Sequence, residues 1–145
     1  MNLRTVSLGG FFIAVVALVI LVFEDSLFAT GYVLLALQAL SVCLMLWART
    51  TFGKRSFHAA ADPTEGGLVT TGPYKYIRHP IYASILYFLW AGIYSHFSDF
   101  TLILGIVATL GISLRIFAEE QLVVVQYPQY AEYAARTKRI IPYIL

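Results

Sequence analysis

The most regular feature of this sequence is a series of long apolar stretches separated by short charged ones. Four runs contain no Asp, Glu, Lys or Arg, and they cover residues 5–23, 26–48, 79–98 and 100–114. A helix needs about 20 apolar residues to cross the hydrocarbon core of a bilayer, with roughly 17 to 25 tolerated. The first three runs meet this length. The fourth is short, but Arg115 can extend its aliphatic stem to the interface, so that the helix can continue to residue 118.

This pattern predicts an all-α fold, an integral membrane bundle of four transmembrane helices. We expect these helices at about residues 5–23, 27–48, 80–97 and 100–118. A cytoplasmic loop over 49–79 would join the second and third helices, and a short cytoplasmic helix over 128–138 would follow the bundle. No repeat or low-complexity segment divides the chain, so residues 1–145 are predicted to form one domain.

The composition also indicates a membrane protein. Hydrophobic residues make up 59% of the chain and charged residues 12%, and the mean hydropathy is +0.76, far from the values of soluble domains. A net charge of +2 is too small to indicate nucleic-acid binding, and a single cysteine, Cys43, excludes a disulfide framework. The first run, with Arg4 ahead of it, could instead be a signal peptide, although no clear cleavage pattern follows it.

The charged residues are distributed asymmetrically between the two ends of the predicted helices. All ten Lys and Arg residues are cytoplasmic if the N-terminus is cytoplasmic. The turns on the other side carry only Glu24 and Asp25, then His96 and Asp99, as the positive-inside rule describes. We therefore expect a multi-pass protein of the inner or plasma membrane, in contact with the lipid bilayer and with both termini in the cytoplasm.

Small residues recur at four-residue spacing in two predicted helices. They are Gly10 and Ala14 in the first helix, and Gly105, Thr109 and Ser113 in the fourth. Such rows allow helix backbones to approach closely in lipid, and packing within the bundle is the favoured interpretation. Four helices make a thin bundle, so the chain could also form a homodimer, but nothing in the sequence selects an interface.

The connection over 49–79 is long for a loop without structure of its own, which indicates a function. It ends in Arg78 and His79. Pro80 follows, and proline suits the first position of a helix because its missing N–H costs nothing there. Backbone N–H groups and the positive end of the helix dipole would meet beside Arg78 and His79, where a carboxylate could bind. The residues leave open an even alternative, in which Arg78 and His79 only anchor the helix among lipid headgroups.

A second charged group, Arg115, Glu119 and Glu120, follows the fourth run. Arg115 and Glu119 lie four residues apart on one helical face and can pair. The two carboxylates could bind an ammonium group, although taken alone they fit a solvated helix end better. In the predicted topology they emerge on the same membrane face as Arg78 and His79. The two groups together suit a zwitterionic ligand that carries a carboxylate and an amine.

The C-terminal segment combines aromatic and basic residues in a short predicted helix. Tyr130 and Tyr133 share a helical face, a spacing more typical of packing than of cofactor contact. The segment would cover the loop as a cytoplasmic cap, with Arg136, Lys138 and Arg139 near anionic lipid.

These motifs, in their order and spacing, resemble the isoprenylcysteine carboxyl methyltransferase family, which is related to the membrane phospholipid methyltransferases. The matching elements are Leu68 to Tyr74, Arg78-His79-Pro80-Ile81-Tyr82, Glu119-Glu120, Tyr130-x-x-Tyr133 and Arg139-x-x-Pro142. They span roughly residues 68–142. Two positions depart from the family pattern, since Ser84 stands where glycine is common and Tyr127-Pro128 where Phe-Gly is common.

The resemblance implies a membrane enzyme that uses S-adenosylmethionine (SAM) without a Rossmann fold. The implied cofactor-binding residues are Gly72, Tyr74, Arg78, His79, Pro80, Tyr82, Glu119 and Glu120. The implied catalytic residues are Glu120, Arg115 and Tyr82. Arg115 would steer an acceptor carboxylate, and Glu120 or Tyr82 would take the proton of an amine acceptor.

Little other catalytic machinery is expected, because a sulfonium is already an activated methyl donor and the protein mainly aligns the acceptor and excludes water. The three scattered histidines, His58, His79 and His96, predict no metal site.

The predicted function is transfer of a methyl group to a lipophilic small molecule or a prenyl- or lipid-type acceptor at the cytoplasmic membrane face. The acceptor group could be a carboxylate, an amine or a thiol. The alternative is a scaffold without catalysis, whose basic loop binds anionic lipid or a protein partner. A reductase that uses a nicotinamide cofactor is disfavoured, because such relatives have larger bundles than 145 residues allow.

Overall fold

The computed structural model describes residues 2–53 and 67–144. Its helices are α1 (Leu3–Phe23), α2 (Tyr32–Phe52), the 3-10 helix η2 (Gly72–Lys75), α3 (Pro80–Ser95), α4 (Asp99–Gln126) and α5 (Tyr130–Arg136). Within these residues the chain forms no β-strand, and its isolated bridge joins Ile77 to Lys138. The prediction of an all-helical fold is confirmed for this part of the chain.

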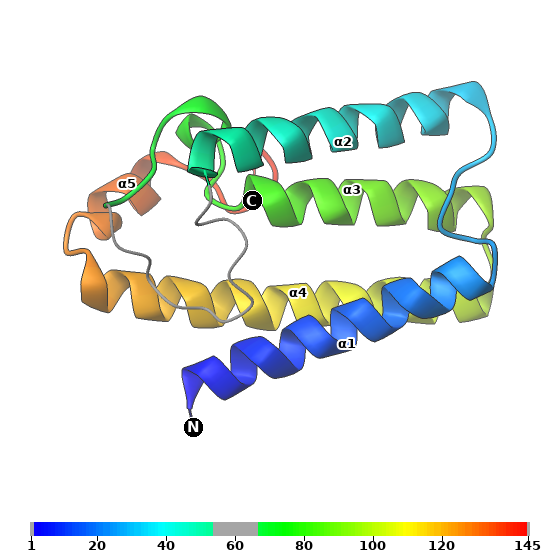
Figure 1. Ribbon diagram of the computed structural model, residues 1–145, viewed down its shortest axis with the longest axis horizontal. Helices are drawn as coiled ribbons and strands as arrows, with labels where there is room; N and C mark the ends of the chain where they lie inside the picture. Colours follow the sequence, from blue (N-terminus) through cyan, green and yellow to red (C-terminus); the bar gives the residue numbers. More distant parts are fainter. Residues whose placement is uncertain (1, 54–66, 145) are drawn as a thin grey trace.

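The four long helices form two pairs. α1 crosses α4 at close range, and α2 lies beside α3 (Figure 1). The connections from α1 to α2 and from α3 to α4 lie at one end of the bundle. The start of α3, the end of α4 and all of α5 lie at the opposite end, which we call the α5 end (Figure 1). Residues that are far apart in the sequence therefore meet at the α5 end.

Three helices, α1, α2 and α4, are long and apolar enough to cross a membrane. Large apolar side chains are exposed along them, among others Phe12, Val33, Leu40 and Leu110. Lipid covers such a surface more favourably than water, so these helices indicate a membrane protein. α3 has 16 residues and rises only about 24 Å at 1.5 Å per residue, against roughly 30 Å for a bilayer core. The fourth span stays a prediction.

The second helix begins later than predicted. We expected it over 27–48, but α2 covers Tyr32–Phe52, so placing 27–31 in the helix was wrong. Gln38 explains the difference, because its side-chain amide donates to the Leu27 carbonyl at 2.8 Å and accepts from the Ala29 N–H at 3.0 Å. These bonds hold the segment before α2 in a non-helical conformation. The loop expected over 49–79 is shorter accordingly, contains η2, and includes residues 54–66, which lie outside the described part.

The other helix ends also differ from prediction. α4 covers Asp99–Gln126 rather than 100–118, because Glu119 and Glu120 are paired and stay within the helix. α3 ends at Ser95 rather than residue 97. The last helix was expected over 128–138 but covers only Tyr130–Arg136, since the residues after it pair with the chain before α3.

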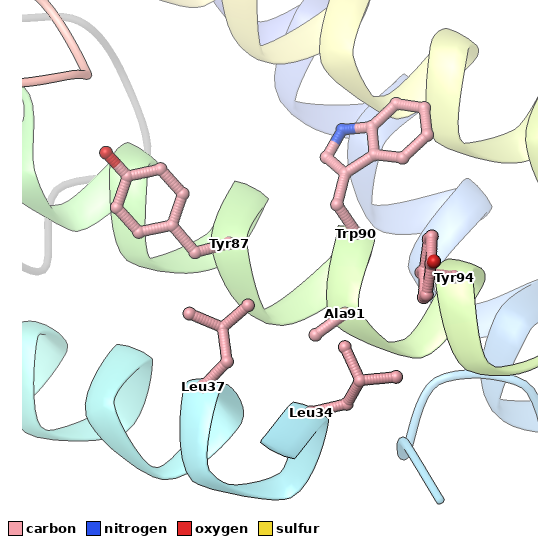
Figure 2. Close-up of a pocket in the computed structure, with 6 residues that line it drawn as sticks. All are labelled: Leu34, Leu37, Tyr87, Trp90, Ala91 and Tyr94. Atoms are coloured by element: carbon pink, nitrogen blue, oxygen red, sulfur yellow. The ribbon is translucent and has the colours of Figure 1, made fainter.

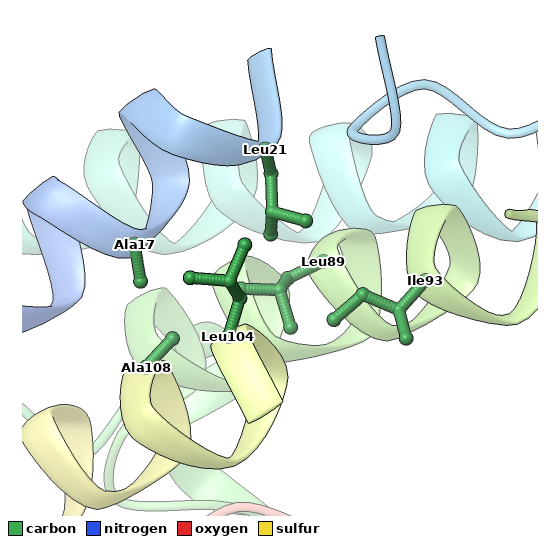
Figure 3. Close-up of a cluster of buried hydrophobic side chains, with 6 residues drawn as sticks. All are labelled: Ala17, Leu21, Leu89, Ile93, Leu104 and Ala108. Carbon is green, nitrogen blue, oxygen red and sulfur yellow. The ribbon is translucent and has the colours of Figure 1, made fainter. Parts of the chain in front are cut away.

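The core is built on close helix contacts. Ala17 and Leu21 of α1, Leu104 and Ala108 of α4, and Leu89 and Ile93 of α3 form one buried cluster (Figure 3). Further along the α1–α4 crossing, a Cβ built on Gly111 would lie 2.6 Å from the Gly10 carbonyl oxygen, so the backbones touch there. In the predicted small-residue row of α4, Gly105 and Thr109 face α3 instead, where Thr109 accepts a 3.1 Å hydrogen bond from the Trp90 indole, and Ser113 is exposed.

Candidate functional site

A cluster of charged side chains occupies the α5 end. Arg78 and His79 precede α3 and Tyr82 lies in its first turn. Arg115, Glu119 and Glu120 lie near the C-terminal end of α4, and Tyr130 and Arg139 come from the C-terminal segment. We call these eight residues the charged cluster. The structure thus brings together six residues predicted for the site and adds two.

Glu120 is the centre of the charged cluster. Its Oε1 accepts from Arg78 Nε at 2.9 Å and from the Tyr130 hydroxyl at 3.2 Å, and it lies 3.3 Å from His79 Nε2. Its Oε2 accepts from Arg139 Nε at 2.9 Å. Both oxygens of this buried carboxylate are therefore engaged by residues of the chain itself.

Arg78 is engaged on both sides of its guanidinium. Besides the bond to Glu120, its Nη1 donates to the Ala134 carbonyl at 2.9 Å and to the Thr137 carbonyl. The side chain is 10% exposed. Arg78 therefore ties the C-terminal segment to α4, a contact that the sequence did not predict.

Glu119 forms a second arrangement with Tyr82 and Arg115. Its Oε1 accepts from the Tyr82 hydroxyl and lies 3.2 Å from Arg115 Nε, which also donates to the Tyr82 hydroxyl. The Arg115 guanidinium lies over the rings of Phe11, at 5.0 Å, and Tyr82, at 5.7 Å. The predicted pair of Arg115 and Glu119 is confirmed by this geometry.

The backbone before α3 pairs with the C-terminal segment. The Arg78 N–H donates to the Lys138 carbonyl at 2.7 Å, and the His79 N–H donates to the Arg139 carbonyl at 3.0 Å. The predicted place for an anion, beside these N–H groups, is thus filled by carbonyl oxygens of the chain. Pairing here also fixes Arg139 next to Glu120.

The remaining predicted site residues lie beside the charged cluster. Pro80 is buried at the first position of α3. Gly72 has a φ of +57° and packs on α2, where a Cβ would lie 2.6 Å from Thr51 Oγ1. The Tyr74 carbonyl accepts from the Tyr133 hydroxyl at 2.7 Å. Gly72 therefore contacts α2, and Tyr74 contacts α5.

Two tyrosines of α5 stay protonated as donors. Burial raises the pKa of Tyr133 to about 12. Burial, and then the negative charge of Glu120, raise the pKa of Tyr130 well above its usual range. Tyr130 therefore keeps its proton to donate to Glu120. Packing was the favoured interpretation of this pair from the sequence, and the contact between Tyr130 and Glu120 was missed.

The charged cluster has an excess of positive charge. It contains three guanidinium groups, Arg78, Arg115 and Arg139, and two carboxylates, Glu119 and Glu120, so its charge is +1 with His79 neutral. Arg139 was expected near anionic lipid, and its contact with Glu120 was not predicted. The sequence signal that could have pointed to Arg139 was its spacing to Pro142 in the motif.

Within the described part of the chain, no three His, Cys, Asp or Glu residues are placed to hold a metal ion.

An apolar groove lies between α2 and α3, further from the α5 end. It has a volume of about 360 Å³ and is lined by Leu34, Leu37, Tyr87, Trp90, Ala91 and Tyr94 (Figure 2). The Tyr87 hydroxyl donates to the Ile140 carbonyl at 2.7 Å. Ile140 follows Arg139, so the groove is connected through Tyr87 to the segment that closes the charged cluster.

Comparison with known proteins identifies relatives of this chain. The sequence model of the family described as phospholipid methyltransferase matches residues 26–130, more than half of the chain. The cobalt-zinc-cadmium resistance protein CzcN of Cupriavidus metallidurans is 34% identical over 76 residues, which are 52% of this chain and 35% of the relative. The chain thus spans about a third of that relative's length. No solved structure matches.

Proposed function

Because this chain belongs to the phospholipid methyltransferase family, we propose that it transfers a methyl group from SAM to a lipophilic acceptor at a membrane surface. Members of this family are methyltransferases, and they generally use this cofactor. The family membership also confirms the resemblance inferred from the motifs over residues 68–142.

The observation that carries the proposal is the convergence of three distant segments in one cluster with charges of both signs. The methionyl part of SAM carries a carboxylate, an amine and a sulfonium. Guanidinium groups and carboxylates within one cluster are chemically suited to such a zwitterion. The cofactor would supply a methyl group already activated by the sulfonium, so the chain's residues have to bind, orient and exclude water.

We assign the roles within the reaction as follows. The motifs imply that residues 72–82 and Glu119–Glu120 would hold the cofactor. Arg115 orients an acidic acceptor group. For an amine acceptor, the Tyr82 hydroxyl can take up the amine proton as it passes its own proton to Glu119 Oε1, to which it is hydrogen-bonded. Glu120, with both oxygens engaged, orients His79 and Arg78.

The acceptor class follows from the surroundings of the charged cluster. The flanking helices present apolar side chains outward, and the apolar groove is lined in part by α3, the helix that carries Tyr82 and follows His79. A lipophilic molecule concentrated in the bilayer would reach the charged cluster from the membrane. From the distribution of basic residues, we place the α5 end and both termini at the cytoplasmic face of an inner or plasma membrane.

The test is calorimetric binding of SAM and S-adenosylhomocysteine (SAH) to the detergent-purified protein. We expect saturable binding that is lost in His79→Ala and kept in His96→Ala. His96 is the matched control because it lies at the other end of the bundle, with its ring bonded to the Phe28 carbonyl at 3.0 Å. A folded wild-type protein that binds neither compound would overturn the proposal and favour the scaffold alternative.

A further inference from the structure

The two adjacent carboxylates of the charged cluster are in different situations. Glu120 is 10% exposed in its side chain, and both oxygens accept from residues of the chain. Glu119 is 22% exposed, and only its Oε1 is engaged closely, by Tyr82 and Arg115. Its Oε2 lies 4.0 Å from the His79 ring nitrogen Nδ1. Glu119 therefore has an oxygen with remaining capacity to accept hydrogen bonds.

The three guanidinium groups differ in the same way. Arg78 is 10% exposed and is engaged by Glu120 and two carbonyls. Arg115 is buried between aromatic rings and Glu119. Arg139 is 52% exposed, and its Nε and Nη2 both contact the same oxygen, Glu120 Oε2, at 2.9 Å. A guanidinium has five N–H donors, so Arg139 keeps donors that face solvent. The excess positive charge of the cluster is accessible there.

We infer that Glu119 and Arg139 are the ligand-facing charges of this site. In this assignment, Glu119 Oε2 accepts from the ammonium group of the ligand and Arg139 donates to its carboxylate. Glu120 and Arg78 are positioning residues that fix Arg139 and the C-terminal segment. The inference rests on the proposed function, since it names which residues bind the zwitterionic end of the cofactor. It moves the emphasis away from Glu120 and Arg78, which the motifs alone would favour.

Electrostatics support this division of roles. A ligand ammonium placed at Glu120 would compete with Arg78, Arg139 and Tyr130 for oxygens that are already satisfied. At Glu119 it would meet a carboxylate whose side chain is 22% exposed and whose Oε2 is less engaged. His79 lies between the two sites, with Nδ1 toward Glu119 and Nε2 toward Glu120. Charge-assisted hydrogen bonds are roughly twice as strong as neutral ones, so each ligand charge should contribute measurably to binding.

The experiment compares four ligands on the full chain by calorimetry. SAH carries both groups, its deaminated analogue keeps only the carboxylate, its decarboxylated analogue keeps only the amine, and 5′-methylthioadenosine lacks both. The variants are Glu119→Gln and Arg139→Gln. Arg136→Gln is the control, because Arg136 lies in the same segment but pairs with Glu132 on the exposed surface.

We expect Glu119→Gln to weaken SAH and the decarboxylated analogue by about tenfold or more, and to leave the deaminated analogue unchanged. Arg139→Gln should weaken SAH and the deaminated analogue to a similar extent, and leave the decarboxylated analogue unchanged. Neither variant should change the affinity for 5′-methylthioadenosine. That ligand separates loss of a contact from loss of the fold, because a misfolded variant would lose all four ligands together.

Several results would overturn the inference. Equal losses for all four ligands in an Arg139→Gln protein that unfolds at the wild-type temperature would make Arg139 a positioning residue. Unchanged SAH binding in Glu119→Gln would remove the proposed ammonium site. Arg139 could also contact the phosphate of an anionic lipid, so binding is repeated in nanodiscs with and without phosphatidylglycerol. A ligand effect of Arg139→Gln confined to nanodiscs with phosphatidylglycerol would assign the residue to lipid. If wild-type protein binds none of the nucleosides, the proposed function itself fails.

Discussion

Replacement of Glu120 is expected to destabilise the α5 end, because this buried carboxylate joins three segments of the chain. In Glu120→Ala, Arg78, which is 10% exposed in the structure, would lose its carboxylate partner while keeping its bonds to two carbonyls. Removing one partner of a buried ion pair typically costs about 3 to 5 kcal/mol. The contact with Arg139 adds little, because that guanidinium is half exposed and such pairs contribute about 0.2 to 1 kcal/mol. We therefore expect a loss of about 3 to 5 kcal/mol in Glu120→Ala.

Glu120→Gln should cost less, about 1 to 3 kcal/mol, because the amide oxygen can still accept from Arg78 while the charge is lost. The free energy of unfolding in detergent is the measurement, with Glu132→Gln as control, since Glu132 forms an exposed pair with Arg136. Hydrogen exchange at the N–H groups of Arg78 and His79, which pair with the C-terminal segment, should also increase. Equal stability of Glu120→Ala and Glu132→Gln would refute the view that Glu120 holds this end together.

Three further predictions concern the bundle and α5. Gly111→Ala should destabilise the protein by about 1 to 3 kcal/mol, because a Cβ would lie 2.6 Å from the Gly10 carbonyl; Gly9→Ala, with nothing within 4 Å, should be neutral or stabilising in the same unfolding assay. Gln38→Leu should cost about 1 to 2 kcal/mol by removing membrane-embedded hydrogen bonds, and an unchanged Tm would contradict this. Burial raises the pKa of Tyr133 from 10.0 to about 12, so the unfolded chain loses this proton first and stability should fall as pH rises from 10 to 12. Stability measured across this pH range should fall less in Tyr133→Phe, and an equal fall would contradict the assignment.

Hydrophobic patterning located the helices of this protein but not all of their ends. The apolar runs are a property of local composition, so the predicted starts of α1 and α4 lie close to their starts in the structure. The start of α2 depends instead on Gln38, whose amide binds a segment nine to eleven residues away. The end of α5 depends on pairing between Lys138 and Arg78. Such bonds form only after the helices have packed, so no local pattern announces them.

The candidate site shows the same division. The order of the predicted spans placed His79 and Glu119 at the same end of the bundle. The four-residue spacing of Arg115 and Glu119 on a helix predicted that these two residues pair. The sequence did not indicate that Arg78 would be satisfied by carbonyls of the C-terminal segment, or that Arg139 would bind Glu120. Both contacts join residues whose separation along the chain, 56 and 19 positions, carries no periodic signal.

By itself, the sequence determined that this is a helical protein with long apolar spans and motifs of a methyltransferase family, and it predicted that the basic residues lie on one side of those spans. Helix length and amphipathic spacing are local properties, and this explains why they can be read along the chain. Only the tertiary structure decided which charges neutralise each other and which remain accessible. Ion pairs and hydrogen bonds depend on distances of about 3 Å, and packing alone sets those distances between residues such as Glu120 and Arg139.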